Sequence, residues 1–192
     1  NFLFKSHNLQ SKRVYWCFRM TIYEPQEDSY LLQKWVKKYS SGKVLDMGTG
    51  SGIQGLAASE SAESILCVDI NPEAVEFVKK KGLKVVQSDL FENVSGKFDL
   101  IIFNPPYLPE DPDEPADSRL ATTGGKKGSE LLERFLKDAK DYLVEDGKIL
   151  VLISSLTGEA EDLFKEYEYK LLDSEKLFFE ELFVYILSEK SI

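Results

Sequence analysis

Strand-like and helix-like stretches alternate along this chain from residue 43 to residue 153. Short apolar runs of strand length are separated by segments long enough to cross over as helices. This alternation predicts an α/β fold with a mostly parallel sheet and right-handed connections. With 192 residues, of which 43% are hydrophobic, the chain is long enough to build one such domain around a full core.

The apolar runs and their flanking residues give expected bounds for each element. The expected strands are residues 43–46, 65–68, 83–87, 98–103 and 148–153. The expected helices are residues 53–59, 71–81, 129–143 and 158–166. Two further β-rich segments, residues 169–177 and 182–187, are expected to form a closing antiparallel pair.

Polar side chains fall at the carboxyl ends of four successive expected strands, namely Asp46, Asp69, Asp89 and Asn104. In open α/β sheets this edge binds the ligand. Asp69 lies about 20 residues beyond a glycine-rich loop, where an acid is placed to bind ribose hydroxyls. Asp89 is placed to accept a hydrogen bond from an adenine amino group. A solvated or capping aspartate is the alternative for each acid alone, but their shared position favours a ligand site.

The glycine-rich loop follows the first expected strand and reads Asp46-Met47-Gly48-Thr49-Gly50-Ser51-Gly52. Alternate glycines let the backbone pass close to a ligand and turn into a helix whose N-terminal amides face the site. The spacing G-x-G-x-G after an acid differs from the dinucleotide fingerprint G-x-G-x-x-G and resembles the methyltransferase pattern. A β–α turn that binds nothing is the alternative.

The tetrapeptide Asn104-Pro105-Pro106-Tyr107 directly follows the expected strand 98–103. It resembles the catalytic motif of S-adenosylmethionine-dependent methyltransferases that act on planar amino or amide nitrogens. The Asn104 side-chain oxygen and the Asn104–Pro105 peptide carbonyl can hold the two N–H groups of such a target. Tyr107 can stack on it, while the prolines fix the shape of the loop. An ordinary Asn-Pro turn is the alternative.

Charge argues against a nucleic-acid substrate. The formal net charge is −9, and residues 110–117, just beyond the tetrapeptide, are mostly acidic. Binding a phosphate backbone requires clustered lysine and arginine instead. This run could attract a basic protein segment or form a solvated loop.

Cysteine usage and hydropathy favour a cytoplasmic protein. Cys17 and Cys67 lie far apart and there is one histidine, so neither a zinc site nor a disulfide framework is supported and no metal is expected. No stretch is long and apolar enough to span a membrane.

Residues 1–19 contain no acid and precede Met20, so they are expected to be an extension, disordered or non-native, with a transit peptide as the alternative. Residues 20–192 are expected to form a single methyltransferase domain.

The segment Tyr23-Glu24-Pro25-Gln26-Glu27-Asp28-Ser29 completes the resemblance. Together with the motifs above, it is similar to the eukaryotic and archaeal HemK-like methyltransferases, which modify the glutamine of the GGQ motif in class I translation release factors. The similarity extends from Met20 to about Leu187. It implies a doubly wound, seven-stranded Rossmann-like sheet with its last strand antiparallel. Read without the family, Glu27, Asp28 and Ser29 form a helix start with acids in the first turn.

The resemblance also implies the roles of individual residues. The catalytic and substrate-binding residues are Asn104, Pro105, Pro106 and Tyr107. The residues implied for binding S-adenosylmethionine, whose product is S-adenosylhomocysteine, are Tyr23, Pro25, Ser29, Asp46, Met47, Gly48, Gly50, Gly52, Asp69, Asp89, Leu90 and Asn104. Of these, Asp46 is expected to orient the amino acid end of the cofactor.

The resemblance further implies a partner, since short members of the family work with a small zinc-ribbon activator protein. Strand addition to the third strand, at Leu83, Val85 and Val86, is one expectation, and simple packing of these residues in the core is the other. Family members often carry a bulky residue before Gly124-Gly125, where this chain has Thr123. With Gly128, this loop is expected to be a mobile lid.

Three other functions stay open on sequence grounds. The same tetrapeptide suits adenine or guanine N-methyltransferases acting on DNA or RNA, which would need the base flipped out of a duplex. A protein lysine methyltransferase is another alternative, although a flexible ammonium uses the paired acceptors less well. A scaffold that has lost its chemistry is the third, and the intact acids and glycines count against it.

Overall fold

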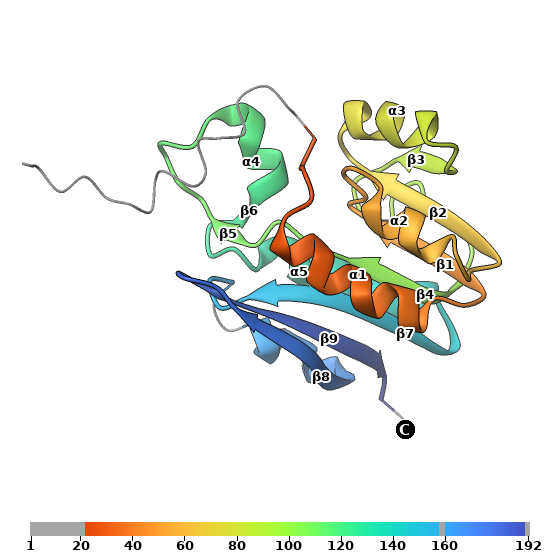
Figure 1. Cartoon of the computed structure of the whole chain (residues 1–192). Helices are drawn as coiled ribbons and strands as arrows, with labels where there is room; N and C mark the ends of the chain where they lie inside the picture. Colours follow the sequence, from red (N-terminus) through yellow and green to blue (C-terminus); the bar gives the residue numbers. More distant parts are fainter. Residues whose placement is uncertain (1–21, 158–159, 191–192) are drawn as a thin grey trace, which may run out of the picture.

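The computed structural model describes residues 22–157 and 160–190, and its centre is a seven-stranded sheet (Figure 1). The strands of this sheet, in spatial order, are β3 (Val85–Gln87), β2 (Ser64–Asp69), β1 (Lys43–Met47), β4 (Phe98–Phe103), β7 (Leu143–Ser154), β9 (Glu181–Glu189) and β8 (Tyr167–Lys176). A separate parallel pair consists of β5 (Leu108–Pro109) and β6 (Thr123–Gly125). The helices are α1 (Glu27–Tyr39), α2 (Ile53–Ala58), α3 (Pro72–Lys80), α4 (Ala116–Thr122) and α5 (Glu130–Ala139), with 3₁₀ helices η3 (Lys140–Tyr142) and η4 (Ala160–Glu166).

Strand β9 alone runs against the rest of the seven-stranded sheet. It pairs antiparallel with β7 on one side, where Val151 lies opposite Tyr185, and with β8 on the other. The remaining neighbours pair in parallel. The predicted doubly wound sheet with an antiparallel last strand is therefore confirmed.

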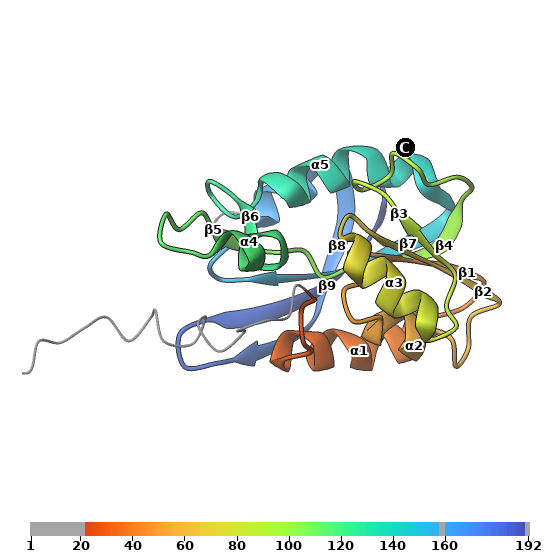
Figure 2. The same ribbon diagram turned by 90° about the horizontal axis from the view of Figure 1, so that it is seen from above.

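Central strand β4 is apolar at every position except the exposed Asp99, and its packing shows why. Ile101 and Phe103 pack into the core on the α5 side, whereas Leu100 and Ile102 pack into the core on the α1 and α2 side. Because successive side chains point to opposite faces, a strand covered on both faces needs an apolar residue at every buried position. Figure 2 shows α5 on one face of the sheet and α1 with α2 on the other.

Several expected bounds are wrong in detail. The helix expected at residues 158–166 is the 3₁₀ helix η4, with residues 158 and 159 outside the described part. The helix expected at 129–143 ends at Ala139, and its last turn is η3. Strand β3 begins only at Val85, so Leu83 lies outside it. Helix α4 and the β5–β6 pair were not expected at all.

The two remaining expectations concern the N-terminal extension and membrane-spanning segments. The extension at residues 1–19 lies outside the described residues. Within the ranges 22–157 and 160–190, no helix combines the length and the apolar character needed to cross a bilayer.

Candidate active site

A cavity of about 600 Å³ opens at the carboxyl ends of the central parallel strands. Its wall contains most of the predicted residues: Tyr23, Ser29, Asp46, Met47, Gly48, Gly50, Asp69, Asp89, Leu90, Asn104, Pro105, Pro106 and Tyr107. Two predicted cofactor residues, Pro25 and Gly52, do not line it. Gly52 instead precedes α2 in a left-handed conformation, with φ of 79°, where glycine is favoured. The structure thus gathers these residues from five separate parts of the sequence around one space.

Asp46 holds the glycine-rich loop in place. Its Oδ2 accepts hydrogen bonds from the Thr49 hydroxyl at 2.5 Å and from the Gly55 amide at 2.9 Å. Burial raises the pKa of Asp46 to about 7, against the hydrogen bonds from Thr49 and Gly55, which lower it. The carboxylate therefore fixes the shape of the loop, and its predicted contact with the amino acid end of a cofactor stays a prediction.

Asp69 ties the same loop to strand β2. Its Oδ2 accepts from the Gly50 amide at 2.8 Å and its Oδ1 from the Asn71 amide at 2.9 Å. Burial raises the pKa of Asp69, although these backbone hydrogen bonds act in the opposite direction. Asp69 lines the cavity, and its predicted contact with ribose hydroxyls stays a prediction.

Asp89 and Leu90 form another part of the wall. Asp89 makes an ion pair with Arg134 of α5, with 2.9 Å between Oδ2 and the guanidinium nitrogen. Leu90 has φ of 46°, which is rare for a bulky residue and costs conformational energy. A strained residue at a cavity wall points to a functional constraint on the backbone. The predicted adenine contact of Asp89 would share its carboxylate with Arg134.

The side-chain amide of Asn104 is held in one orientation by Asp28. Asn104 Nδ2 donates to Asp28 Oδ2 at 3.0 Å, and the Tyr23 hydroxyl donates to the same oxygen at 3.0 Å. A carboxylate only accepts, so the amide nitrogen must face it and Oδ1 must face away. Asp28 is 4% exposed, and its Oδ1 accepts from the Ser29 amide at 2.5 Å.

Two oxygens in the wall are buried acceptors without a donor. Among the described residues, three buried side-chain oxygens have no hydrogen-bond partner, and two of them, Asn104 Oδ1 and Gln54 Oε1, belong to residues of the cavity wall. Leaving such an oxygen unpaired costs free energy, which a ligand donor would recover. Gln54 is itself fixed by donating from Nε2 to the Ser29 carbonyl at 2.8 Å.

Asp28 and Gln54 are two polar residues of the cavity wall that the sequence motifs do not predict. The sequence predicts only a helix start at Asp28, although this residue stands inside the Tyr23–Ser29 motif. Gln54 directly follows the glycine-rich loop and carries no motif of its own. The one sequence signal for a role of Asp28 and Gln54 in the site is their position within or next to the motifs.

The phenols of Tyr23 and Tyr107 stay protonated at neutral pH. Burial raises the pKa of both, and the nearby Asp28 carboxylate raises them further. Tyr107 packs against the apolar cluster beneath α1. Neither phenol is therefore a general base, and both serve as hydrogen-bonding or packing surfaces.

The loop expected to be a mobile lid packs directly on the tetrapeptide. A Cβ added at Gly124 would lie 2.2 Å from the Gly128 carbonyl oxygen and 2.5 Å from the Pro106 carbonyl oxygen. Thr123, which replaces the bulky family residue, donates from its hydroxyl to Glu114 at 2.7 Å. This segment includes strand β6, which pairs with β5, and its mobility stays a prediction.

We expect Gly124→Ala to destabilise the protein by about 1–3 kcal/mol, because the added methyl group must push the tetrapeptide loop and the Gly128 turn apart. Turnover should fall with it, since Pro106 moves. Urea denaturation and an activity assay measure both quantities. Gly82→Ala is the matched control, because a Cβ there meets nothing within 4 Å and only backbone strain is added. Gly82→Ala should keep its turnover, because it lies away from the tetrapeptide, and wild-type stability and turnover of Gly124→Ala would contradict the packing argument.

Comparison with known proteins agrees with this geometry. Residues 26–174 match the family model described as Methyltransferase small domain. A protein of Methanocaldococcus jannaschii, assigned as a protein N5-glutamine methyltransferase, is 44% identical over 176 residues, which cover 85% of this chain and 89% of that protein. Methyltransferase HEMK2 of Mus musculus is 30% identical over 164 residues, covering 75% of this chain and 76% of the mouse protein.

A solved structure extends the agreement to three dimensions. The E. cuniculi Mtq2–Trm112 complex, responsible for methylation of the termination factor eRF1, matches with a TM-score of 0.73 at 26% identity. The match covers 90% of this chain and 100% of the other. The chain therefore belongs to the methyltransferase small-domain family and, within it, to the HemK-like methyltransferases.

Proposed function

We propose that this protein transfers a methyl group from S-adenosylmethionine to the side-chain amide nitrogen of the glutamine in the GGQ motif of a class I release factor. The observation that carries the proposal is the unpartnered, buried Oδ1 of Asn104 in the wall of the cavity. The hydrogen bond from Nδ2 to Asp28 leaves this oxygen as an acceptor for an N–H group.

The chain's own residues account for catalysis by positioning. An amide nitrogen is a weak nucleophile because its lone pair is delocalised, so its orientation decides the rate. Asn104 Oδ1 accepts one N–H of the target amide, and the Asn104 carbonyl oxygen accepts the other. Tyr107 packs on the flat amide. No general base is required, since the alkylated nitrogen is acidic enough to lose its proton to water.

The cavity fits S-adenosylmethionine in size and in chemistry. A volume of about 600 Å³ is typical of a small-molecule site. Asp69 and Asp89 offer carboxylates to the hydroxyl and amino groups of a nucleoside, and Leu90 offers an apolar side chain to its base. The unpartnered Gln54 Oε1 is an acceptor suited to the amino group of the methionine end. When bound, this cofactor supplies an electrophilic methyl group.

Charge and relatives support a protein substrate. Glu110, Asp111 and Asp113 are exposed on the loop that follows the tetrapeptide, where a nucleic acid would have to enter. The M. jannaschii relative is assigned to glutamine methylation, and the E. cuniculi complex methylates a termination factor. The cytoplasm, where translation terminates, is the compartment we propose for this activity.

We also propose a small zinc-ribbon activator as a partner, bound by strand addition at β3. This strand lies at one edge of the sheet, and Val85 and Val86 are only partly buried there. A sheet edge offers unpaired backbone groups to an added strand. In support, the matching E. cuniculi structure is a complex with Trm112.

Incubation of the protein and its activator with labelled S-adenosylmethionine and a release factor tests the function. We expect label on the factor, mass-spectrometric assignment to the GGQ glutamine, and loss of label when this glutamine is replaced. Undiminished labelling of the glutamine-less factor would reject the proposal. Parallel reactions with protein-free DNA or RNA and with lysine-containing histone peptides test the alternatives.

A further inference from the structure

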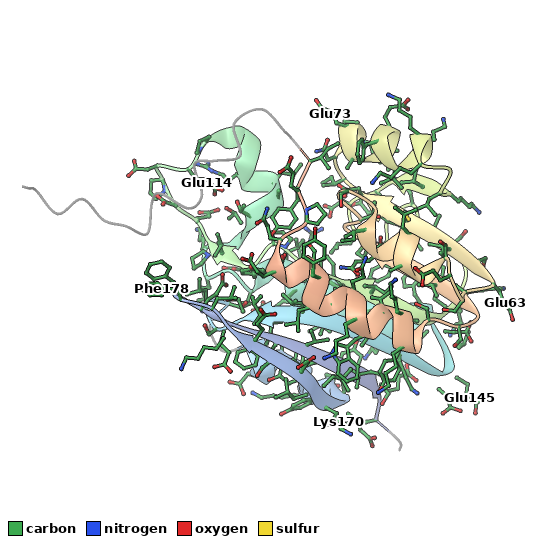
Figure 3. All side chains as sticks on the ribbon, viewed as in Figure 1. Glu63, Glu73, Glu114, Glu145, Lys170 and Phe178 are labelled. Carbon is green, nitrogen blue, oxygen red and sulfur yellow. The ribbon has the colours of Figure 1, made fainter. Side chains whose placement is uncertain are left out.

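Two aromatic side chains stand exposed at the turn between β8 and β9, which we call the hairpin tip (residues 177–180). Phe178 is 86% exposed, the highest value for a large hydrophobic residue in the described part of the chain, and Phe179 is 48% exposed. Their rings contact each other edge to face, with centroids 4.6 Å apart. Figure 3 shows Phe178 projecting outward from the end of the hairpin. Exposed aromatic pairs of this kind often mark an interaction surface.

Hydrogen bonds anchor the hairpin tip to the sheet. The Leu177 amide donates to the Glu180 carbonyl at 2.8 Å, which closes the turn. Below the turn, the Ser154 hydroxyl donates to Glu180 Oε2 at 2.6 Å, and the Glu181 amide donates to the Ser155 hydroxyl at 3.0 Å. Because the tip is anchored to the end of β7, a partner that binds it pays little for ordering it.

The hairpin tip lies beside the mouth of the active site. Strand β7 anchors the hairpin tip and runs parallel to β4, so both strands end on the side of the sheet where Asn104 follows β4. Leu177 and Tyr107 pack on the same apolar cluster. The pKa of Tyr107 is raised mainly by burial and by Asp28, and Glu180 is near enough to raise it further. Figures 1 and 2 both show the tip at the end of the molecule that carries β5, β6 and α4.

We propose that the hairpin tip docks the protein substrate, with Phe178 and Phe179 against an apolar surface of the domain that carries the target glutamine. This inference rests on the proposed function. A glutamine side chain that enters the cavity brings its whole domain against the rim, and the rim residues then supply most of the affinity. Large aromatic side chains are the usual anchors of such contacts.

The charges around the hairpin tip specify the substrate further. The carboxylates of Glu180 and Glu27 both lie close to Tyr107, and the exposed acids of the 110–113 loop follow the tetrapeptide. The docked surface is therefore an apolar patch flanked by basic residues, which would be steered toward the acidic rim. The proposed activator does not compete for it, since β3 and β8 lie at opposite edges of the sheet.

The double variant Phe178→Ser/Phe179→Ser tests the docking role in the protein bound to its activator. We expect KM for the intact release factor to rise at least about 10-fold with kcat within twofold, because hot-spot aromatics are lost outside the chemical site. KM for a short GGQ peptide, which cannot span to the tip, and the Kd for S-adenosylmethionine should not change. Leu171→Ser is the matched control, since Leu171 is also exposed on β8 at 45% but lies away from the tip.

Other results would overturn the docking role or the proposed function itself. An unchanged KM for the intact factor overturns the docking role and leaves the proposed function standing. A parallel loss with the peptide and with the cofactor overturns it too, because the change then acts through the fold. A wild-type dimer that the double variant converts to a monomer assigns the surface to a second copy of this chain instead. Absence of any labelling of the release factor by the wild-type complex rejects the proposed function itself.

Discussion

Asn104→Ala is expected to lower kcat by between about 10² and 10³, the usual effect of removing one polar group that holds the reacting atoms. Of the buried side-chain oxygens without a partner in residues 22–157 and 160–190, the variant loses the one that belongs to the tetrapeptide. Cofactor affinity should change little, because Asp69, Asp89, Leu90 and Gln54 still line the cavity. Loss of kcat with retained binding is the pattern of an interaction that acts on the transition state.

Single-turnover kinetics with the release factor and isothermal titration with S-adenosylmethionine measure the two quantities separately. Asn93→Ala is the matched control, because the Asn93 amide also donates one hydrogen bond, to the Gln87 carbonyl, but its residue is exposed and outside the cavity wall. Its kcat should stay within twofold of the wild type. Wild-type turnover by Asn104→Ala would remove this residue from the proposed mechanism.

The parts of the molecule that sequence reasoning predicted are those encoded locally. Strand β4 is recognisable because both of its faces are buried, which requires an apolar residue at every buried position. The left-handed conformations of Gly48, Gly50 and Gly52 follow from alternate glycines after a strand. Asn71 accepts from the Glu73 amide at the start of α3, as an asparagine before a proline predicts. The order of the outer strands came from the family resemblance instead.

The parts that could not be predicted depend on contacts between distant residues. Asp28 meets Asn104 across 76 positions of sequence, and Asp89 meets Arg134 across 45. Neither pair has a spacing that distinguishes it from other acids and donors. The sequence does not predict the close packing of Gly124 on Pro106 either, because a Gly-Gly pair is compatible with a mobile loop as well as with a tight backbone contact.

The proposed chemistry and the proposed recognition of the substrate lie in different elements. The orientation of the Asn104 oxygen that we propose as the acceptor for the target amide is set by α1 and the loop after β4, through Asp28 and Asn104. The hairpin tip is set by β7, β8 and β9, with Glu180 bonded to Ser154. Both features lie where the parallel strands end, but they belong to separate elements. Substitutions of Asp28 or Asn104 should therefore alter kcat, and substitutions in the hairpin tip should alter KM.

Asp28→Asn tests whether the orientation of the Asn104 amide is the decisive feature, and we expect kcat to fall about 10²-fold, as for other small misplacements of reacting groups. The wild-type carboxylate accepts on both oxygens, from Asn104 and Tyr23 on Oδ2 and from Ser29 on Oδ1. An asparagine has only one acceptor oxygen. If that oxygen faces Ser29, its amide nitrogen faces Asn104, which must then flip and use Oδ1 to accept from residue 28. The oxygen needed by the target is thereby consumed.

Asp173→Asn is the control for the same chemical change elsewhere, because Asp173 also accepts from two side chains, Lys34 at 2.7 Å and Trp35 at 2.9 Å, but does not line the cavity. It should lose some stability and keep its kcat. For Asp28→Asn we expect some loss of stability as well, because the buried residue 28 keeps only one acceptor oxygen for Asn104, Tyr23 and Ser29. The decisive readout is the Kd for S-adenosylmethionine, which should stay near wild type while kcat falls. A wild-type kcat in this variant would show that Asn104 keeps its orientation without Asp28, and a fall matched by lost cofactor binding would assign Asp28 to the cofactor pocket instead.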